Sequence, residues 1–323
     1  MSNSQSDPSD SGRVYDAPSD TFVYRALPRS LWPHAQLARW DRPIGWQLLM
    51  WPCFWSAAMA ANVAAQMGVF SGATFLWHLA LFFIGSVAMR GAGCTYNDLI
   101  DHDIDNQVAR TRSRPLPAGR ITRWHAKLFI LAQALVGLLV LLQFNWFTVG
   151  LGVFSLVFVA VYPFAKRFTD WPQFFLGLAF SWGALMGWAA TFGTVSQASV
   201  LLYLGAIAWT VGYDTIYAYQ DVEDDELIGV RSTARRFGDR PKPWLIGLYG
   251  LTMLLFLLAF VAAGLGMVAY LGLGIAAGLL AYQIVVLDIR NPAQCLQLFK
   301  FNRVVGLMMF ISLLIALIIR LAA

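Results

Sequence analysis

Three aspartates near the end of a long apolar segment are the residues in this sequence best suited to chemistry. Asp98, Asp101 and Asp105 stand at positions i, i+3 and i+7. A helix turns by about 100° per residue, so this spacing puts the three carboxylates on one stripe about 60° wide. Carboxylates this close repel one another unless a cation joins them. Mg²⁺ takes oxygen ligands and commonly bridges carboxylates to substrate phosphates, so the spacing predicts a Mg²⁺ site.

A second acidic segment repeats this pattern. Asp214, Asp221 and Asp225 stand at 0, +7 and +11, again within about 60° of one helical face. The strings Asn-Asp-x-x-Asp at 97–101 and Gln-Asp-x-x-Asp at 220–224 also match, which suggests duplicated halves. Two facing carboxylate clusters would hold Mg²⁺ ions with a diphosphate between them. The alternative is that both clusters are solvated helix ends.

Several cations accompany the first acidic segment. Arg110, Arg112 and Arg114 follow it directly and are placed to neutralise phosphate oxygens. Arg90 lies about two helical turns deeper in the apolar segment, where a cation is costly and indicates a functional site. Two interpretations of Arg90 stay open: an ion pair with Asp214 that ties two helices together, or a contact to the carboxylate of an anionic substrate.

The elements that position these residues are membrane-spanning helices. Of the 323 residues, 58% are hydrophobic and 13% are charged, against about 25% charged in ordinary soluble domains. The composition predicts an all-α integral membrane protein. With about 20 apolar residues as the template for a span, the sequence predicts nine helices, at 44–61, 75–97, 124–143, 146–164, 174–192, 200–220, 244–263, 266–287 and 304–321.

The orientation of the spans follows from the distribution of Lys and Arg. These residues occur in the alternate connections 98–123, 165–173, 221–243 and 288–303, and are absent from the intervening turns 62–74, 144–145, 193–199 and 264–265. The positive-inside rule makes the first set cytoplasmic. The amino terminus and both acidic helix ends are therefore expected on the cytoplasmic side. The same bias explains the net charge of +5 without a nucleic-acid partner.

Residues 1–38 are polar, rich in Ser, Asp and Pro, and lack an apolar run. They predict a disordered, dispensable tail ahead of a transmembrane domain at 39–323. Acids such as Asp7 and Asp10 argue against a mitochondrial transit peptide, which is usually poor in acids, so the expected location is a bacterial inner membrane. The three isolated cysteines, Cys53, Cys94 and Cys295, indicate neither a disulfide framework nor a zinc site.

From about Arg39 onward the chain resembles the UbiA superfamily of intramembrane prenyltransferases. The resemblance is carried by RWDRPIGWQLLMWPCFWS at 39–56, MRGAGCTYNDLIDHDID at 89–105, ARTRSRPLPAGRIT at 109–122, YPFAKRFTDWPQ at 162–173 and YDTIYAYQDVEDD at 213–225. The Asn-Asp-x-x-Asp-x-x-x-Asp motif is common to the superfamily. The flanking strings RGAGCTYND and RSRPLPAGRIT narrow the resemblance to the branch that acts on 4-hydroxybenzoate.

The resemblance implies roles for individual residues. The metal and diphosphate motifs would be Asn97, Asp98, Asp101 and Asp105 in the first segment, and Asp221 and Asp225 in the second. Contacts to the diphosphate end of the donor or to the aromatic acid would come from Arg90, Arg110, Arg114, Tyr162 and Lys166.

The reaction implied by the resemblance uses Mg²⁺ and an allylic polyprenyl diphosphate, whose tail enters from membrane lipid. The polyprenyl group moves to the ring carbon ortho to the hydroxyl of 4-hydroxybenzoate, diphosphate leaves, and the product enters ubiquinone biosynthesis. The proton acceptor stays open between Asp214, Asp221 and the departing diphosphate.

Two alternatives compete with this interpretation. One is a prenyltransferase of the same superfamily with another acceptor, such as homogentisate, a naphthoate, haem or a glycerol phosphate. The other is a secondary transporter, because transporters also have internal repeats and intramembrane charges. The acids here lie at helix ends beside basic loops rather than at broken helices near the midplane, which argues against a transporter.

Overall fold

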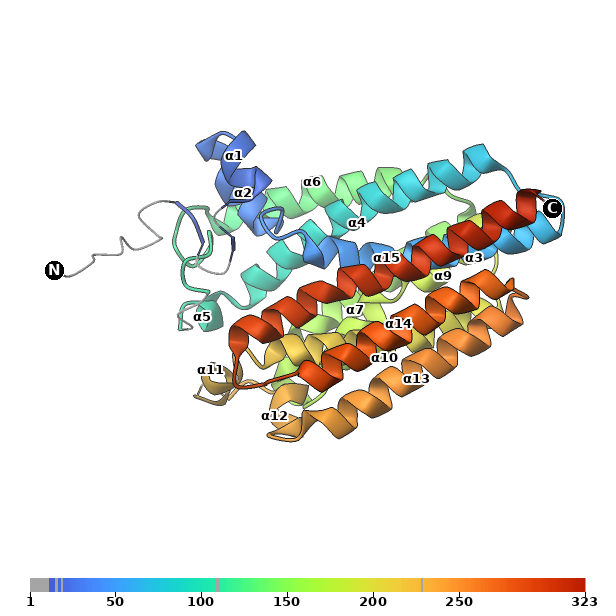
Figure 1. The fold of residues 1–323 in the computed structure, drawn as a ribbon. Helices are drawn as coiled ribbons and strands as arrows, with labels where there is room; N and C mark the ends of the chain where they lie inside the picture. The colour runs from blue at the N-terminus through green and yellow to red at the C-terminus, as the bar shows by residue number, and fades with distance from the viewer. Residues whose placement is uncertain (1–11, 15–16, 19, 108–110, 228, 323) are drawn as a thin grey trace. The chain divides into compact units, whose positions relative to one another are not determined.

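The structure is a computed structural model that describes residues 12–14, 17–18, 20–107, 111–227 and 229–322 (Figure 1). The described residues are helical, turn or irregular and contain no strand. Nine stretches among them are long and apolar enough to cross a membrane. These are α3 (Ile44–Gln66), α4 (Gly72–Ile100), α6 (Arg123–Leu141), α7 (Trp146–Phe168), α8 with α9 (Pro172–Phe180 and Gly183–Phe192), α10 (Gln197–Ala218), α13 (Pro241–Ala262), α14 (Met267–Val286) and α15 (Pro292–Ala322).

The predicted all-α fold with nine spans is therefore confirmed for the part of the chain that the structure describes. Most boundaries shift by a few residues, and two spans differ more. The last span begins at Pro292 rather than near 304, because proline is favoured at a first helical position and the charged residues that follow it continue the helix. The fifth span is broken into α8 and α9, where Ser181 and Trp182 leave the helix. The predicted cytoplasmic amino terminus stays a prediction.

The chain divides into two compact units. The first comprises Met1–Trp46 and Ile84–Leu139, and the second comprises Gln47–Phe83 and Val140–Ala323.

The first unit contains short helices in the region predicted to be a disordered tail. These are α1 (Phe22–Ala26), the 3-10 helix η2 (Arg29–Leu31) and α2 (Trp32–Leu37). Val23 and Ala35 are buried, and Tyr24 packs edge-to-face on Trp32 with ring centroids 5.0 Å apart. Leu37 joins a second apolar cluster with Leu116, Ile121 and Ala126. Residues 22–37 are therefore largely helical in the structure, with one local apolar cluster and one contact, through Leu37, to residues far along the chain; the predicted domain boundary at residue 38 stays a prediction.

The second unit is built around α10, which packs against α8, α9, α13 and α15. Glycines let α10 approach its neighbour α13 closely: a Cβ at Gly205 would lie 2.6 Å from the ring of Phe256. Trp209 of α10 is buried and donates its indole N–H to Asn302 Oδ1 of α15 at 2.9 Å. This packing fixes α10, whose last turns carry Asp214. In Figure 1 the helices α13, α14 and α15 lie side by side in chain order, each packed against its neighbour, and α13 and α15 also pack against α10.

Candidate functional site

The first acidic segment lies where α4 ends and the short helix α5 (His102–Asp105) begins. Helical hydrogen bonding continues across the junction, because Asp101 N donates to Asn97 O at 2.9 Å and Asp105 N donates to Asp101 O at 2.8 Å. The segment therefore keeps the helical spacing from which a shared face was predicted. One guanidinium reaches both ends of that face: Arg114 Nη1 lies 3.4 Å from Asp98 Oδ1 and 3.1 Å from Asp105 Oδ2.

The three carboxylates are not a solvated helix end. Asp98, Asp101 and Asp105 are 0%, 2% and 6% exposed. Buried carboxylates need partners that offset the loss of hydration. Asn97 supplies one such contact, since its Nδ2 donates to Asp101 Oδ2 at 2.9 Å. Arg110, which sequence reasoning placed beside this cluster, lies outside the described residues.

The pKa of Asp105 reflects the burial and the charges of this cluster. Burial raises the pKa of the Asp105 carboxyl above its usual value, the Arg114 guanidinium opposes that rise, and the charges of Asp98 and Asp101 add to it. Loss of hydration is thus the largest effect on this carboxyl, and a bound cation would offset it.

Sequence reasoning missed a second arginine of this cluster. Arg39, just after α2, donates from Nη2 to Asp98 Oδ1 at 2.6 Å, with side chains 9% and 0% exposed. The available signal was its place in the string that begins the resemblance, two residues before Asp41 and next to a span. The contact itself joins residues 59 positions apart and has no local pattern.

The donor set fits Mg²⁺. Asp98 Oδ2 is buried and has no hydrogen-bond partner among the described residues. Within the same part of the chain, no three acidic, histidine or cysteine side chains are grouped so that they could hold a metal ion by themselves, so water and substrate oxygens would have to complete the site. Mg²⁺ suits such an arrangement, because it usually binds through one or two carboxylates together with water and substrate phosphates.

Arg90 lies in α4 and packs on the first turn of α3. A Cβ added at Gly45 would come within 2.5 Å of Arg90 Nε, so glycine makes room for this guanidinium. The predicted pair with Asp214 would join residues of the two units, and it stays a prediction.

The second acidic segment lies at the end of α10 and in α11 (Val222–Leu227). Asp214, Asp221 and Asp225 are half-buried. Asp225 N donates to Asp221 O at 2.8 Å, so these two residues keep a helical spacing although α10 ends at Ala218. The side chain of Asp224 lies outside the described residues.

Tyr162 and Lys166 occupy the last turns of α7 and are half-buried. The segment after α11 crosses this helix end, where Arg231 N donates to Lys166 O at 3.3 Å and Arg231 Nη1 donates to Phe168 O at 3.2 Å. Within the second unit, the structure thus connects the end of α7 to the loop that follows Asp225.

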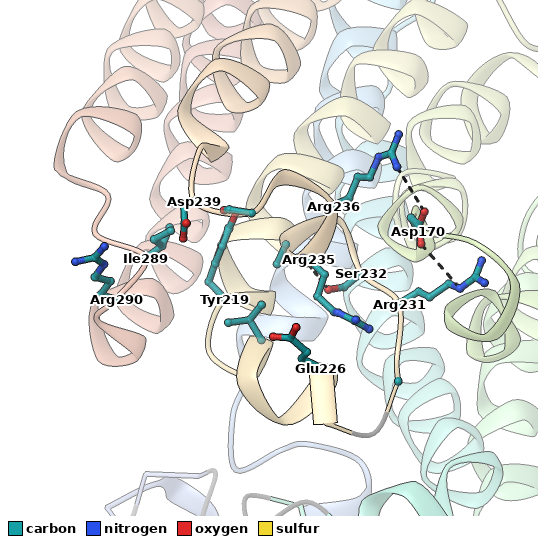
Figure 2. A pocket seen from close by; sticks show the side chains of 14 residues that line it. Asp170, Tyr219, Glu226, Arg231, Ser232, Arg235, Arg236, Asp239, Ile289 and Arg290 are labelled. Atoms are coloured by element: carbon teal, nitrogen blue, oxygen red, sulfur yellow. Dashed lines mark hydrogen bonds and ion pairs between the residues drawn. The ribbon is translucent and has the colours of Figure 1, made fainter.

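A hollow of about 1170 Å³ opens beside α11 (Figure 2). Its lining includes Arg231, Arg236 and Asp170, and the two arginines flank the carboxylate at 3.9 and 4.0 Å. Each of these pairs is largely exposed, so each is worth little. The described residues that line the hollow include none of the predicted site residues. We therefore do not assign it to the reaction.

Known proteins identify the fold and the family. A model described as the UbiA prenyltransferase family matches residues 49–314. The chain belongs to this family. Two relatives are named "4-hydroxybenzoate polyprenyltransferase, mitochondrial". The one from Aedes aegypti is 47% identical over 290 residues, covering 88% of this chain and 63% of that protein. The one from Homo sapiens is 43% identical over 301 residues, covering 92% and 78%. The chain thus spans less than two thirds of the Aedes protein.

Solved structures of UbiA family members have the same fold. A UbiA homolog from Aeropyrum pernix has a TM-score of 0.67 and 22% identity, over 83% of this chain and 97% of that one. A UbiA homolog from Archaeoglobus fulgidus, solved bound to GPP and Mg²⁺, has a TM-score of 0.63 and 19% identity, over 88% and 99%.

The relatives confirm the predicted family and correct the predicted location. Both relatives are named as mitochondrial proteins, which contradicts the expected bacterial inner membrane. The prediction failed because span length and apolar composition are common to helices of both membranes. The acidic residues near the start of the sequence are a property of that segment alone, and they do not determine the membrane into which the helices insert.

Proposed function

We propose that this UbiA family member transfers a polyprenyl group from an allylic polyprenyl diphosphate to the ring carbon ortho to the hydroxyl of 4-hydroxybenzoate, releasing diphosphate, in ubiquinone biosynthesis. The names of relatives that are 43–47% identical over about nine-tenths of the chain support the acceptor and the reaction. The observation that carries the chemistry is the buried cluster of three aspartates held by arginines at the end of α4.

Mg²⁺ is the proposed cofactor. When bound, it would supply Lewis-acid stabilisation of the charge that grows on the leaving diphosphate. In the first segment the proposed ligands are Asp98, Asp101 and Asp105, with Asn97 beside them, and the buried free oxygen of Asp98 supports this assignment. In the second segment Asp221 and Asp225 are proposed on their sequence pattern. The Archaeoglobus structure, solved with GPP and Mg²⁺, supports a metal in this family.

Arg114 is proposed to hold the diphosphate, together with Arg110. Its guanidinium lies at the rim of the carboxylate cluster, with a side chain 11% exposed. A planar guanidinium donates paired hydrogen bonds that match phosphate oxygens. Arg114 would thereby stabilise charge on the departing group as the C–O bond of the donor ionises to an allylic cation.

The predicted residues that lie outside the two acidic segments and the arginine loop are proposed to bind the aromatic acceptor and to orient the substrates. Arg90 is proposed to bind the carboxylate of 4-hydroxybenzoate, and Tyr162 and Lys166 to orient the ring and the diphosphate end of the donor. Asp214, Asp221 or diphosphate would take the ring proton. The nine apolar spans found among the described residues suit this chemistry, because lipid admits the polyprenyl tail and a dry site protects the cation from water.

The decisive experiment incubates membranes containing the protein with Mg²⁺, a mixture of polyprenyl diphosphates and 4-hydroxybenzoate, and identifies the product by mass spectrometry. We expect a 4-hydroxybenzoate derivative heavier by one polyprenyl group, formed only with Mg²⁺. Homogentisate and a naphthoate serve as competing acceptors in the same assay. Product from either of these, and none from 4-hydroxybenzoate, would refute the proposed acceptor.

A further inference from the structure

Arg39 has an unusual backbone for a long side chain. Its φ is +59°, and it is the one non-glycine residue with positive φ in the described part of the chain. Residues other than glycine rarely adopt this left-handed backbone conformation, and it persists only where contacts with the rest of the protein stabilise it. The conformation follows directly after α2 and turns the chain toward α3.

Two contacts of the guanidinium hold this conformation. Nη1 donates to Gln36 O at 2.8 Å, and Nη2 donates to Asp98 Oδ1 at 2.6 Å. Gln36 is itself buried, and its Nε2 donates to Gly12 O at 2.9 Å and to Tyr24 Oη at 3.2 Å. Residues that precede Arg39 in the chain therefore hold its guanidinium in the position from which it contacts Asp98.

The same amino-terminal segment also holds the loop that carries Arg114. Leu37 packs against Leu116 and Ile121. Arg120 donates one N–H to Gly12 O and another to Ser113 O. The loop after α5 is therefore anchored on Gly12 and Leu37, both of which lie outside the range matched by the family model.

The two arginines on Asp98 differ in how tightly they are bound. Arg39 is 9% exposed and contacts Asp98 at 2.6 Å, whereas Arg114 lies at the looser distance of 3.4 Å and is shared with Asp105. Arg39 is therefore the tighter of these two partners of Asp98, and Arg114 divides its contacts between Asp98 and Asp105. Since Arg39 binds Oδ1, the other oxygen of Asp98 is left for a cation.

We propose that Arg39 is a positioning residue of the prenyl-transfer site, and that Gly12 and residues 20–41 are a clasp that fixes the first acidic segment and its arginine loop. Arg39 does not touch substrate. It acts by orienting Asp98, and its planar fork spans two acceptors that the single ammonium of lysine does not span. The proposal rests on the proposed function, because the ligand of the oriented carboxylate is the Mg²⁺–diphosphate pair.

The test compares Arg39→Met and Arg39→Lys with Arg25→Met in purified full-length protein. Arg25 belongs to the same segment, but its pair with Asp20 is exposed, with side chains 71% and 76% accessible. The readouts are the Mg²⁺-induced rise in Tm with inorganic diphosphate present, the rate of trypsin cleavage in the loop after α5, and the Mg²⁺ concentration for half-maximal turnover.

We expect both Arg39 variants to need about 10–100-fold more Mg²⁺, the usual effect of losing a group that orients a metal ligand. Arg39→Met should also lose most of the Mg²⁺-induced rise in Tm and be cleaved faster, with the KM for 4-hydroxybenzoate unchanged. Arg25→Met should match wild type. If Arg39→Met does not fold, Arg39→Lys, which keeps the charge, carries the comparison.

Two outcomes overturn the inference. Wild-type Mg²⁺ dependence and cleavage in Arg39→Lys would show that orientation by the fork is unimportant. Tighter Mg²⁺ binding with unchanged turnover in Arg39→Met would show that Arg39 only opposes the cation. Failure of the proposed function is distinct from both, because the wild-type protein itself would then show neither product nor a Mg²⁺-dependent Tm.

Discussion

Replacement of Gly187 by alanine tests a close backbone approach of two helices in the second unit. A Cβ at Gly187 of α9 would lie 2.5 Å from Cys53 O and 2.6 Å from Ala57 N of α3. Both atoms belong to the backbone, so no side-chain rotation relieves the contact. Ordinary contact begins at 3.4 Å, so α9 must move away from α3 by about 1 Å. Overpacking of this kind costs about 1–3 kcal/mol.

A matched control separates packing from helix propensity. Gly250 of α13 is exposed, and a Cβ there meets no described atom within 4 Å. Alanine in place of a mid-helix glycine gains about 0.5–1 kcal/mol when nothing clashes. Gly187→Ala should therefore lower, and Gly250→Ala should equal or raise, the free energy of unfolding measured in mixed detergent micelles. Equal stabilities of the two variants would refute the close approach of α9 to α3.

Three further predictions concern the site and its surroundings. Asp101→Ala and Asp221→Ala should each abolish prenyl transfer while the protein still elutes as folded in detergent, and wild-type turnover in either would remove that residue from the metal site. Arg90→Ala should raise the KM for 4-hydroxybenzoate more than that for the prenyl donor; an unchanged value would make Arg90 structural. Burial and the charge of Asp239 raise the pKa of Tyr219 above its usual value of 10.0, so the unfolded chain loses this proton first and stability falls as pH rises above about 10. Tyr219→Phe should show a shallower alkaline loss of Tm, and identical pH profiles would contradict this.

The amino-terminal region shows where composition misleads. Its polar residues predict disorder, and few of its side chains are apolar. Those few are nonetheless buried: Val23 and Trp32 pack with Ala35 in a local cluster, and Leu37 packs against Leu116 and Ile121 of a distant loop. A segment too polar to fold by itself becomes ordered when another segment covers its apolar side chains.

The sequence by itself determined the nine spans and the acidic stripe. Both follow from short-range rules, since a membrane requires long apolar helices and a helix places residues i, i+3 and i+7 on one face. Flanking strings also indicated the family that the relatives then confirmed. Only the tertiary structure decided that Asp98 is buried and that Arg39, 59 residues away, contacts it at 2.6 Å. Such a contact depends on where α2 lies beside the end of α4, and no local spacing encodes that placement.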